Sequence, residues 1–171
     1  MSNITIRGIS FYLASLLFLL ALLQIAGCKN KDYAKKALEQ RGIVFSEDAF
    51  LQEVREGNRD NVEMFTKAGI DINARAGDGC TALMVASERL DIEMARLLIE
   101  NGADANARDI DGYTALMYVS YEGNLEIAKL LVKNGADVNA RDNDGWTALR
   151  FALLGGKTHL ADYLRKNGAG E

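Results

Sequence analysis

The stretch Gly102-Ala-Asp-Ala-Asn-Ala-Arg-Asp-Ile-Asp-Gly-Tyr-Thr-Ala-Leu116 decides the fold, because it recurs along the chain. The same pattern returns 33 residues later as Gly135-Ala-Asp-Val-Asn-Ala-Arg-Asp-Asn-Asp-Gly-Trp-Thr-Ala-Leu149. It also occurs 33 residues earlier, between Gly69 and Leu83, with several substitutions. A fixed period between about 20 and 50 residues is typical of a solenoid, in which similar supersecondary units stack on one another. The sequence therefore predicts a stack of repeats.

Each period contains the signals for two short helices and a loop. A threonine before Ala-Leu is predicted to cap the first helix, because its hydroxyl accepts a backbone N–H bond. The second helix has apolar residues at helical spacing, which is typical of a stripe that faces a core. A glycine then follows where a helix needs a C-terminal residue at positive φ. The capping threonines are Thr81, Thr114 and Thr147, and the glycines are Gly102, Gly135 and Gly168. The Asp-x-Asp-Gly segments suit a tight projecting loop.

These motifs resemble the ankyrin repeat, whose pattern runs from Gly-x-Thr-x-Leu at a helix start to Gly-Ala-Asp-x-Asn at a hairpin. The resemblance covers about residues 45–171 and implies an all-α solenoid of four helix-turn-helix units with hairpin loops. The units are predicted at 45–77, 78–110, 111–143 and 144–171. The first lacks the Gly-x-Thr-x-Leu start and resembles an N-terminal cap. The last has a polar second helix, which suits a C-terminal cap because the end of a solenoid faces water.

One position departs from the family pattern. Where ankyrin repeats have Thr-Pro-Leu-His, this chain has Thr-Ala-Leu followed by Met84, Met117 or Arg150. The missing imidazole removes the hydrogen bond that usually braces adjacent loops in the family. Methionine is flexible and fills gaps by packing. We expect some loss of stability and no change of fold.

The N-terminus predicts export and lipid attachment. Arg7 precedes a nearly continuous apolar run over 9–26, which is typical of a secretory signal peptide. The run ends in Ile25-Ala-Gly-Cys28, which resembles a bacterial lipobox, so residues 1–27 are predicted to be removed and Cys28 to be acylated. Two acyl chains give a stable membrane anchor where one is marginal.

The segment after the lipobox is predicted to be a tether. Residues 28–44 comprise the acylated cysteine and this tether, with a helix-forming composition over 31–40 and Gly42 as a plausible helix stop. An uncleaved single-span membrane helix is the alternative, because about 18 apolar residues just reach across a bilayer. In that case the positive charges after the apolar run would favour a cytoplasmic location for the segment that follows it. These charges are Lys29, Lys31, Lys35 and Lys36.

Composition and motifs argue against several classes of function. The net charge of −4 gives no basic footprint for nucleic acid. His159 is the single histidine and is expected on a solvated cap. No group of residues in the sequence has metal-ligand spacing, and no hydroxyl has a plausible base to activate it as a nucleophile. We expect no enzyme activity, no metal and no cofactor. With Cys28 acylated, Cys80 is the one free thiol, and it is either a reactive or pairing thiol or a half-buried, inert one.

By the family resemblance, another protein is expected to bind the concave face through loop tips and the exposed ends of the inner helices. The positions that this implies are Glu88, Arg89, Ile110, Tyr113, Tyr121, Asn143 and Trp146. Tyrosine and tryptophan are enriched at binding hot spots. The alternative for Trp146 is packing under its own loop. Tyr118 and Phe151 are predicted to pack between helices.

These expectations combine into one hypothesis. The chain is predicted to be a monomeric, extracytoplasmic adaptor or scaffold, anchored to a membrane by lipid and binding a protein by shape. Lys29 and Asn30 follow the cysteine in place of the aspartate that signals inner-membrane retention. The periplasmic face of the outer membrane is therefore the expected location in a Gram-negative cell. The alternatives are an immunity or inhibitor protein that plugs a toxin or envelope enzyme, and a purely structural envelope protein.

Overall fold

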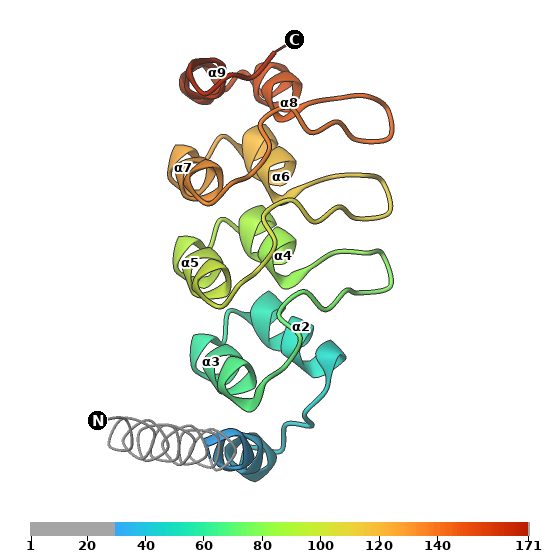
Figure 1. Ribbon diagram of the computed structural model, residues 1–171, viewed down its shortest axis with the longest axis vertical. Coiled ribbons are helices and arrows are strands. Elements are labelled where there is room, and N and C mark those ends of the chain that lie inside the picture. The colour runs from blue at the N-terminus through green and yellow to red at the C-terminus, as the bar shows by residue number, and fades with distance from the viewer. Residues whose placement is uncertain (1–29, 171) are drawn as a thin grey trace, which may run out of the picture.

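The computed structural model describes residues 30–170, whose helices form a stack of pairs (Figure 1). The pairs are α2 (Glu47–Glu56) with α3 (Arg59–Ala68), α4 (Ala82–Glu88) with α5 (Ile92–Glu100), α6 (Ala115–Glu122) with α7 (Leu125–Lys133), and α8 (Ala148–Leu154) with α9 (Thr158–Lys166). The predicted all-α solenoid of helix-turn-helix units is confirmed. The predicted signal peptide 1–27, the lipidation site Cys28 and the terminal Glu171 lie outside the described residues.

The helices stand in two rows with loops on one side (Figure 1). The inner row contains α2, α4, α6 and α8, and the outer row contains α3, α5, α7 and α9. Long loops precede α4, α6 and α8 and project from the inner row away from the outer row. Between residues 30 and 170 the loops form no strand, and the β-bridge found there joins Arg75 to Thr81. The inner helices and the loops thus enclose an angle along the whole stack.

The predicted helix boundaries are largely confirmed. Thr81 and Thr147 accept hydrogen bonds from the backbone N–H groups of Met84 and Arg150, each at 3.4 Å. Thr114 has the same extended backbone but makes no such bond, so the cap prediction is wrong there. The N–H of Met117 donates instead to the backbone carbonyl of Thr114, at 3.0 Å. The glycines after the outer helices do adopt positive φ, with 90° at Gly102, 87° at Gly135 and 91° at Gly168.

The methionines that replace the expected imidazole are part of the core. Met84 and Met117 are buried between successive units. The backbone N–H of Thr81 donates to the sulfur of Met84 at 3.4 Å, so one weak hydrogen bond remains where the imidazole would be. Arg150 occupies the same position in the unit 144–171, and it is exposed. The substitution pattern therefore follows burial.

A ladder of asparagines joins each unit to the next. Asn73 accepts from the N–H of Asp104 at 2.8 Å. Asn106 accepts from the N–H of Asp137 at 2.7 Å and donates to the carbonyl of Gly135 at 2.8 Å. Asn139 repeats this with Gly170 and Gly168, at 2.8 and 3.0 Å. These side chains satisfy backbone groups that the turns would otherwise leave unpaired.

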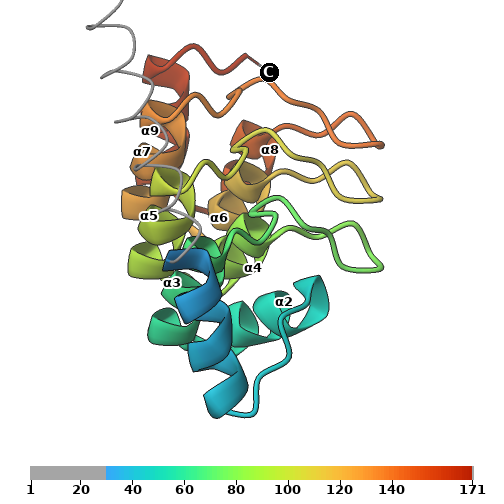
Figure 2. The ribbon, with the colours of Figure 1, turned by 60° about the horizontal axis from the view of Figure 1, so that its bottom comes forward.

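The segment predicted as a tether contains a docked helix. Residues 30–40 are helical, and Figure 2 shows this helix across the N-terminal end of the stack. Ala34 and Leu38 lie four residues apart and so share one face of the helix. Leu38 is fully buried in the same cluster as Phe50 and Phe65. The ordered body therefore includes part of the segment 28–44. The helix ends before Gly42, which has the positive φ of 74° expected of a stop.

The other end of the stack is only partly polar. The exposed residues of α9 are Thr158, His159, Asp162, Arg165 and Lys166, in agreement with a solvated cap. Helix α8, however, leaves Leu153 and Leu154 exposed. No helix within residues 30–170 combines the length and the apolar character that crossing a bilayer requires.

Candidate functional site

A pocket of about 320 Å³ opens in the angle between the inner helices and the loops. Its walls come from three successive units, because α4, α6 and α8 lie side by side. Aromatic rings and one methionine form most of the wall, and two carboxylates stand at the ends of α4 and α6. The lining residues are Tyr113, Met117, Tyr118, Tyr121 and Phe151, with Glu88 and Glu122.

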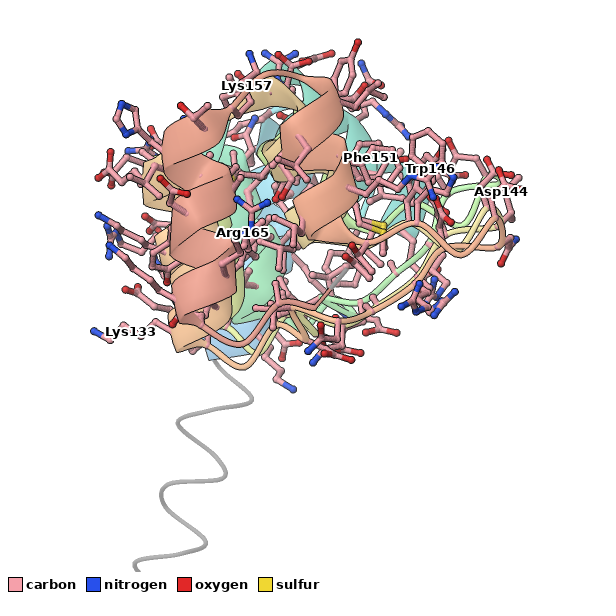
Figure 3. The ribbon with its side chains drawn as sticks, turned by 90° about the horizontal axis from the view of Figure 1, so that it is seen from above. Lys133, Asp144, Trp146, Phe151, Lys157 and Arg165 are labelled. Carbon is pink, nitrogen blue, oxygen red and sulfur yellow. The ribbon has the colours of Figure 1, made fainter. Side chains whose placement is uncertain are left out.

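Four of the aromatic rings in this region form a continuous row. The Tyr113 ring contacts Tyr118 and Phe151 edge to face, with ring centroids 5.8 and 5.4 Å apart. Phe151 continues the row to Trp146, at 5.4 Å. Figure 3 shows Phe151 and Trp146 next to each other, between α8 and the loop whose tip contains Asp144. Aromatic pairs at these spacings add stability beyond the area that they bury. The row therefore lies across the third and fourth units.

Aspartates hold the loop backbone from which these rings project. Oδ1 of Asp109 accepts hydrogen bonds from the N–H groups of Asp111 and Tyr113, at 3.0 and 2.8 Å. Oδ1 of Asp142 accepts in the same way from Asp144 and Trp146, at 3.0 and 2.7 Å. An aspartate whose carboxylate accepts hydrogen bonds from nearby backbone N–H groups stabilises a turn, even where no helix or strand continues. Tyr113 and Trp146 are thus held in equivalent conformations.

Cys80, Tyr118 and Asp109 form a short chain of hydrogen bonds under the pocket. The Tyr118 hydroxyl donates to Oδ2 of Asp109 at 2.7 Å. Because that proton is used, the Cys80 thiol, whose sulfur is 3.7 Å away, is the donor toward the Tyr118 oxygen. Burial raises the pKa of Tyr118, and the bond to Asp109 raises it further. Burial also raises the pKa of Cys80.

The surroundings of Cys80 favour its protonated form. The thiolate is the nucleophilic species of cysteine, and it is disfavoured wherever burial raises the pKa. The contact with Tyr118 lowers the pKa of Cys80, but the carboxylates of Asp78 and Asp109 raise it, and the pKa is raised overall. Cys80 is half-buried at the base of the loop before α4. This environment fits the inert-thiol alternative better than the reactive one.

Negative charge surrounds the aromatic row. Burial is the first cause of a raised pKa at Tyr113, and the charges of four aspartates add to it. They are Asp142, Asp111, Asp144 and Asp109. With raised pKa values, the Tyr113 and Tyr118 hydroxyls do not supply a base near neutral pH. Within residues 30–170, no group of His, Cys, Asp or Glu side chains is placed to hold a metal ion.

The structure brings together part of the predicted binding set. Glu88, Tyr113 and Tyr121 line the pocket, and Tyr121 is 52% exposed. Trp146 lies outside the lining, at the end of the aromatic row. Arg89 is exposed at the C-terminal end of α4. It does not line the pocket.

Ile110 and Asn143 have a different role at the loop tips. Ile110 is 66% exposed, but its backbone N–H donates to the carbonyl of Asp78 at 3.2 Å. Its carbonyl accepts from the side chain of Asn143 at 2.9 Å, and the N–H of Asn143 donates to the carbonyl of Asp111. The Asn143 side chain therefore joins two adjacent loops. The Ile110 side chain is free to contact a partner.

Tyr118 and Phe151, predicted to pack between helices, also form pocket wall. A signal for Tyr118 exists in the sequence. Tyr121 was placed on the concave face, and residues three or four apart on a helix share a face. That spacing assigns Tyr118 to the same face as Tyr121 and Glu122. Phe151 is the equivalent of Tyr118 one unit later.

Comparison with known proteins agrees with this architecture. No curated protein sequence matches the chain. Residues 50–142 match a family described as ankyrin repeats (3 copies), and residues 120–165 match one described as ankyrin repeats (many copies). Ankyrin repeats imply a protein–protein interaction module, and proteins built from them are usually non-enzymatic binding scaffolds. More than half of the chain is matched, so the chain belongs to the ankyrin-repeat family.

Proposed function

We propose that this chain is a lipid-anchored adaptor that binds another protein on the surface formed by the pocket and the aromatic row. The observation that carries the proposal is the row itself, in which four rings in mutual contact lie along the concave face. Protein interfaces obtain most of their binding energy from a few buried aromatic and arginine side chains. The row supplies such side chains within one small area.

The rigidity of the site supports binding by shape. Ordering a loop or a side chain on association lowers affinity, so a site that is already ordered binds more tightly. Here Asp109 and Asp142 fix the loop tips, and Asn143 ties the loop before α6 to the loop before α8. Trp146 is restrained on one side by Phe151 and on the other by the Arg150 guanidinium, 4.1 Å from its ring. A partner would therefore meet a preformed surface.

The anchor is proposed from the lipobox Ile25-Ala-Gly-Cys28. The helical residues 30–40 lie close to that cysteine in the chain and pack on the first unit. An acylated Cys28 would therefore hold the stack close to the lipid surface, with its N-terminal end nearest the membrane. The absence of aspartate after Cys28 favours the outer membrane in a Gram-negative cell.

Site-specific photo-crosslinking in intact cells tests the binding surface. A photoreactive amino acid in place of Tyr121 should give one discrete crosslinked product. The same amino acid in place of Glu126, an exposed residue of α7, should not give it. Adding Tyr113→Ala and Trp146→Ala to the Tyr121 probe should remove the product. The same product from both positions, or one that survives the double substitution, contradicts the proposed surface.

The crosslinked partner also separates the adaptor from the inhibitor. Once the product is identified by mass, its activity is measured with and without the full chain. Retained activity in the complex agrees with a scaffold. A tight one-to-one complex that abolishes the activity identifies an inhibitor and contradicts the adaptor.

A further inference from the structure

The composition of the pocket indicates which chemical group it accepts, provided that it binds a protein as proposed above. Its walls are the faces and edges of Tyr113, Tyr118, Tyr121 and Phe151. The electron-rich face of an aromatic ring attracts cations. Apolar side chains also pack on such rings, so the walls alone do not choose between the two.

Two carboxylates favour a cation over an apolar side chain as the occupant of the pocket. Glu88 is the last residue of α4, and Glu122 is the last residue of α6. Both are exposed and both line the pocket. The C-terminal end of a helix already carries partial negative charge, so an acidic residue there is less stable than a basic one. Glu56 and Glu100 end α2 and α5 in the same way, so a glutamate at a helix end does not by itself indicate a ligand. Glu88 and Glu122 differ from them because both line one aromatic pocket, where their charges complement a positive ligand.

The loops reinforce the negative potential on the opposite side of the pocket. Asp109 lies under Tyr118 and accepts its hydroxyl proton. Four aspartates lie near enough to Tyr113 for their negative charges to disfavour its ionised form. They are Asp109, Asp111, Asp142 and Asp144. A cation that enters between Glu88 and Tyr113 would therefore have acidic groups on the helix side and on the loop side.

The cations of this region do not occupy the pocket. Arg150 stacks on the outer ring of the aromatic row, with its guanidinium 4.1 Å from the Trp146 centroid. Lys157 lies against Gly123, where an added Cβ would be 2.5 Å from its chain, and Arg89 is exposed at the end of α4. None of the three lines the pocket. Arg150 nevertheless shows that this row can accept a guanidinium on a ring face.

We infer that the pocket receives a basic side chain of the partner protein, with arginine preferred to lysine. A planar guanidinium can lie on the tyrosine and phenylalanine rings and still donate hydrogen bonds to Glu88 and Glu122, whereas an ammonium is a compact point charge. The volume of about 320 Å³ is at the lower limit of pockets that bind small molecules, roughly 300–1,000 Å³. It suits one long side chain.

Selection from a peptide library tests this inference without a known partner. The full chain, purified in detergent, is immobilised and used to select from displayed random 12-residue peptides. The selected sequences should share an arginine or lysine at one position, with arginine more frequent. In the strongest peptide, replacing that arginine by the neutral isostere citrulline should weaken binding about five- to tenfold, and lysine should weaken it less.

Paired variants of the chain identify the groups involved. Glu88→Gln with Glu122→Gln should weaken the arginine peptide about five- to tenfold and reduce the dependence of its affinity on salt. The control is Glu100→Gln with Glu126→Gln, two exposed glutamates of the outer helices, which should change neither. All four substitutions are at exposed positions, so circular dichroism and the unfolding midpoint should stay unchanged.

The outcomes separate this inference from the proposed function. Peptides that need Tyr113 and Trp146 but contain no shared basic residue would overturn the inference and leave the binding surface intact. A shared arginine whose affinity is indifferent to Glu88→Gln with Glu122→Gln would also overturn it. If no selected peptide is weakened by Tyr113→Ala with Trp146→Ala, both the inference and the proposed surface are contradicted.

Discussion

Asp109 connects the loop before α6 to that helix. One carboxylate oxygen fixes the backbone of Tyr113, and the other accepts the hydroxyl proton of Tyr118. Asp142 repeats the first of these contacts for Trp146. The equivalent position in the loop before α4 is Ala76, and this loop presents Cys80 instead of an aromatic residue. Aromatic residues therefore occur in the two loops that have this aspartate.

Replacing Tyr118 by phenylalanine should measure the value of the bond to Asp109. The ring and its packing remain, but the carboxylate loses a donor. A hydrogen bond to a charged group contributes about 1.5–3 kcal/mol, so we expect a loss of about 1–2 kcal/mol at this half-buried site. Urea unfolding at pH 7 measures it. Tyr121→Phe is the control, because Tyr121 is more exposed, and it should change stability by less than about 0.5 kcal/mol.

The same variant predicts a dependence on pH. The pKa of Tyr118 is raised in the folded protein, whereas an unfolded tyrosine titrates near about 10. Below that pH both states are protonated, and the full stabilisation is present. Above it the unfolded chain loses the proton first, so the stabilisation falls as pH rises. The difference in unfolding free energy between the wild type and Tyr118→Phe should therefore shrink between pH 9 and 11. A constant or growing difference would show that the proton is not held more tightly in the fold.

At the scale of elements, the asparagine ladder determines how strongly neighbouring units are coupled. In a repeat protein each unit contacts only its neighbours, so stability is close to a sum of unit and interface contributions. Asn73, Asn106 and Asn139 each pair with backbone groups about 30 residues further along the chain. Each bond therefore belongs to an interface between units.

Asn106→Ala should destabilise the stack more than Asn139→Ala. Asn106 joins the second unit to the third, and its loss removes two interface hydrogen bonds at about 0.5–1.5 kcal/mol each. The bonds of Asn139 reach only Gly168 and Gly170, at the C-terminal end. We expect Asn106→Ala to lower the free energy of unfolding by about 1–3 kcal/mol, which urea unfolding measures as a lower midpoint. For Asn139→Ala we expect mainly local fraying of the C-terminal end. Equal effects of the two variants would contradict this view of the ladder.

The elements also show what the sequence could predict. The period positions the last three helical pairs because those units repeat the same local signals, and it places the first pair one period earlier. The docking of the 30–40 helix was not predicted, since this helix packs on the one unit that lacks the Gly-x-Thr-x-Leu start. The Thr114 hydroxyl does not cap its helix although Thr114-Ala-Leu repeats Thr147-Ala-Leu, and the N–H of Met117 donates to the backbone carbonyl of Thr114 instead. Local motifs determine elements, whereas contacts between elements depend on packing.

The site shows the same division at residue scale. Tyr113, Tyr121 and Glu88 were assigned to the concave face from their position in the repeat, and all three line the pocket. Tyr118 was missed because its position next to the buried Met117 suggested burial. The helical face that it shares with Tyr121 was the better guide. The role of Asn143 between two loops requires the distance between them, which no single unit contains.

At the scale of the whole molecule, the stack has two unlike ends. The N-terminal end is covered by the 30–40 helix, whose Lys35 lies over the ring of Phe45 at 4.6 Å. The C-terminal end exposes Leu153 and Leu154. If Cys28 carries lipid, the covered end is next to the membrane and the pocket, which is built by α4, α6 and α8, lies beyond the first unit. The proposed anchor would thus leave the binding surface accessible to a partner in the same compartment.

The two cysteines of the chain allow a matched test of that anchor. Cells are fed an alkyne fatty acid, and the purified chain is examined for label and for mass. The wild type and Cys80→Ala should incorporate the label and lose residues 1–27, because acylation and cleavage involve only Cys28. Cys28→Ala should lose the label entirely. Unchanged labelling of Cys28→Ala contradicts the lipoprotein. A third outcome identifies the single-span anchor instead. In that case the wild type and Cys28→Ala both remain unlabelled, uncleaved and in the membrane, since about 18 apolar residues suffice to hold the chain there.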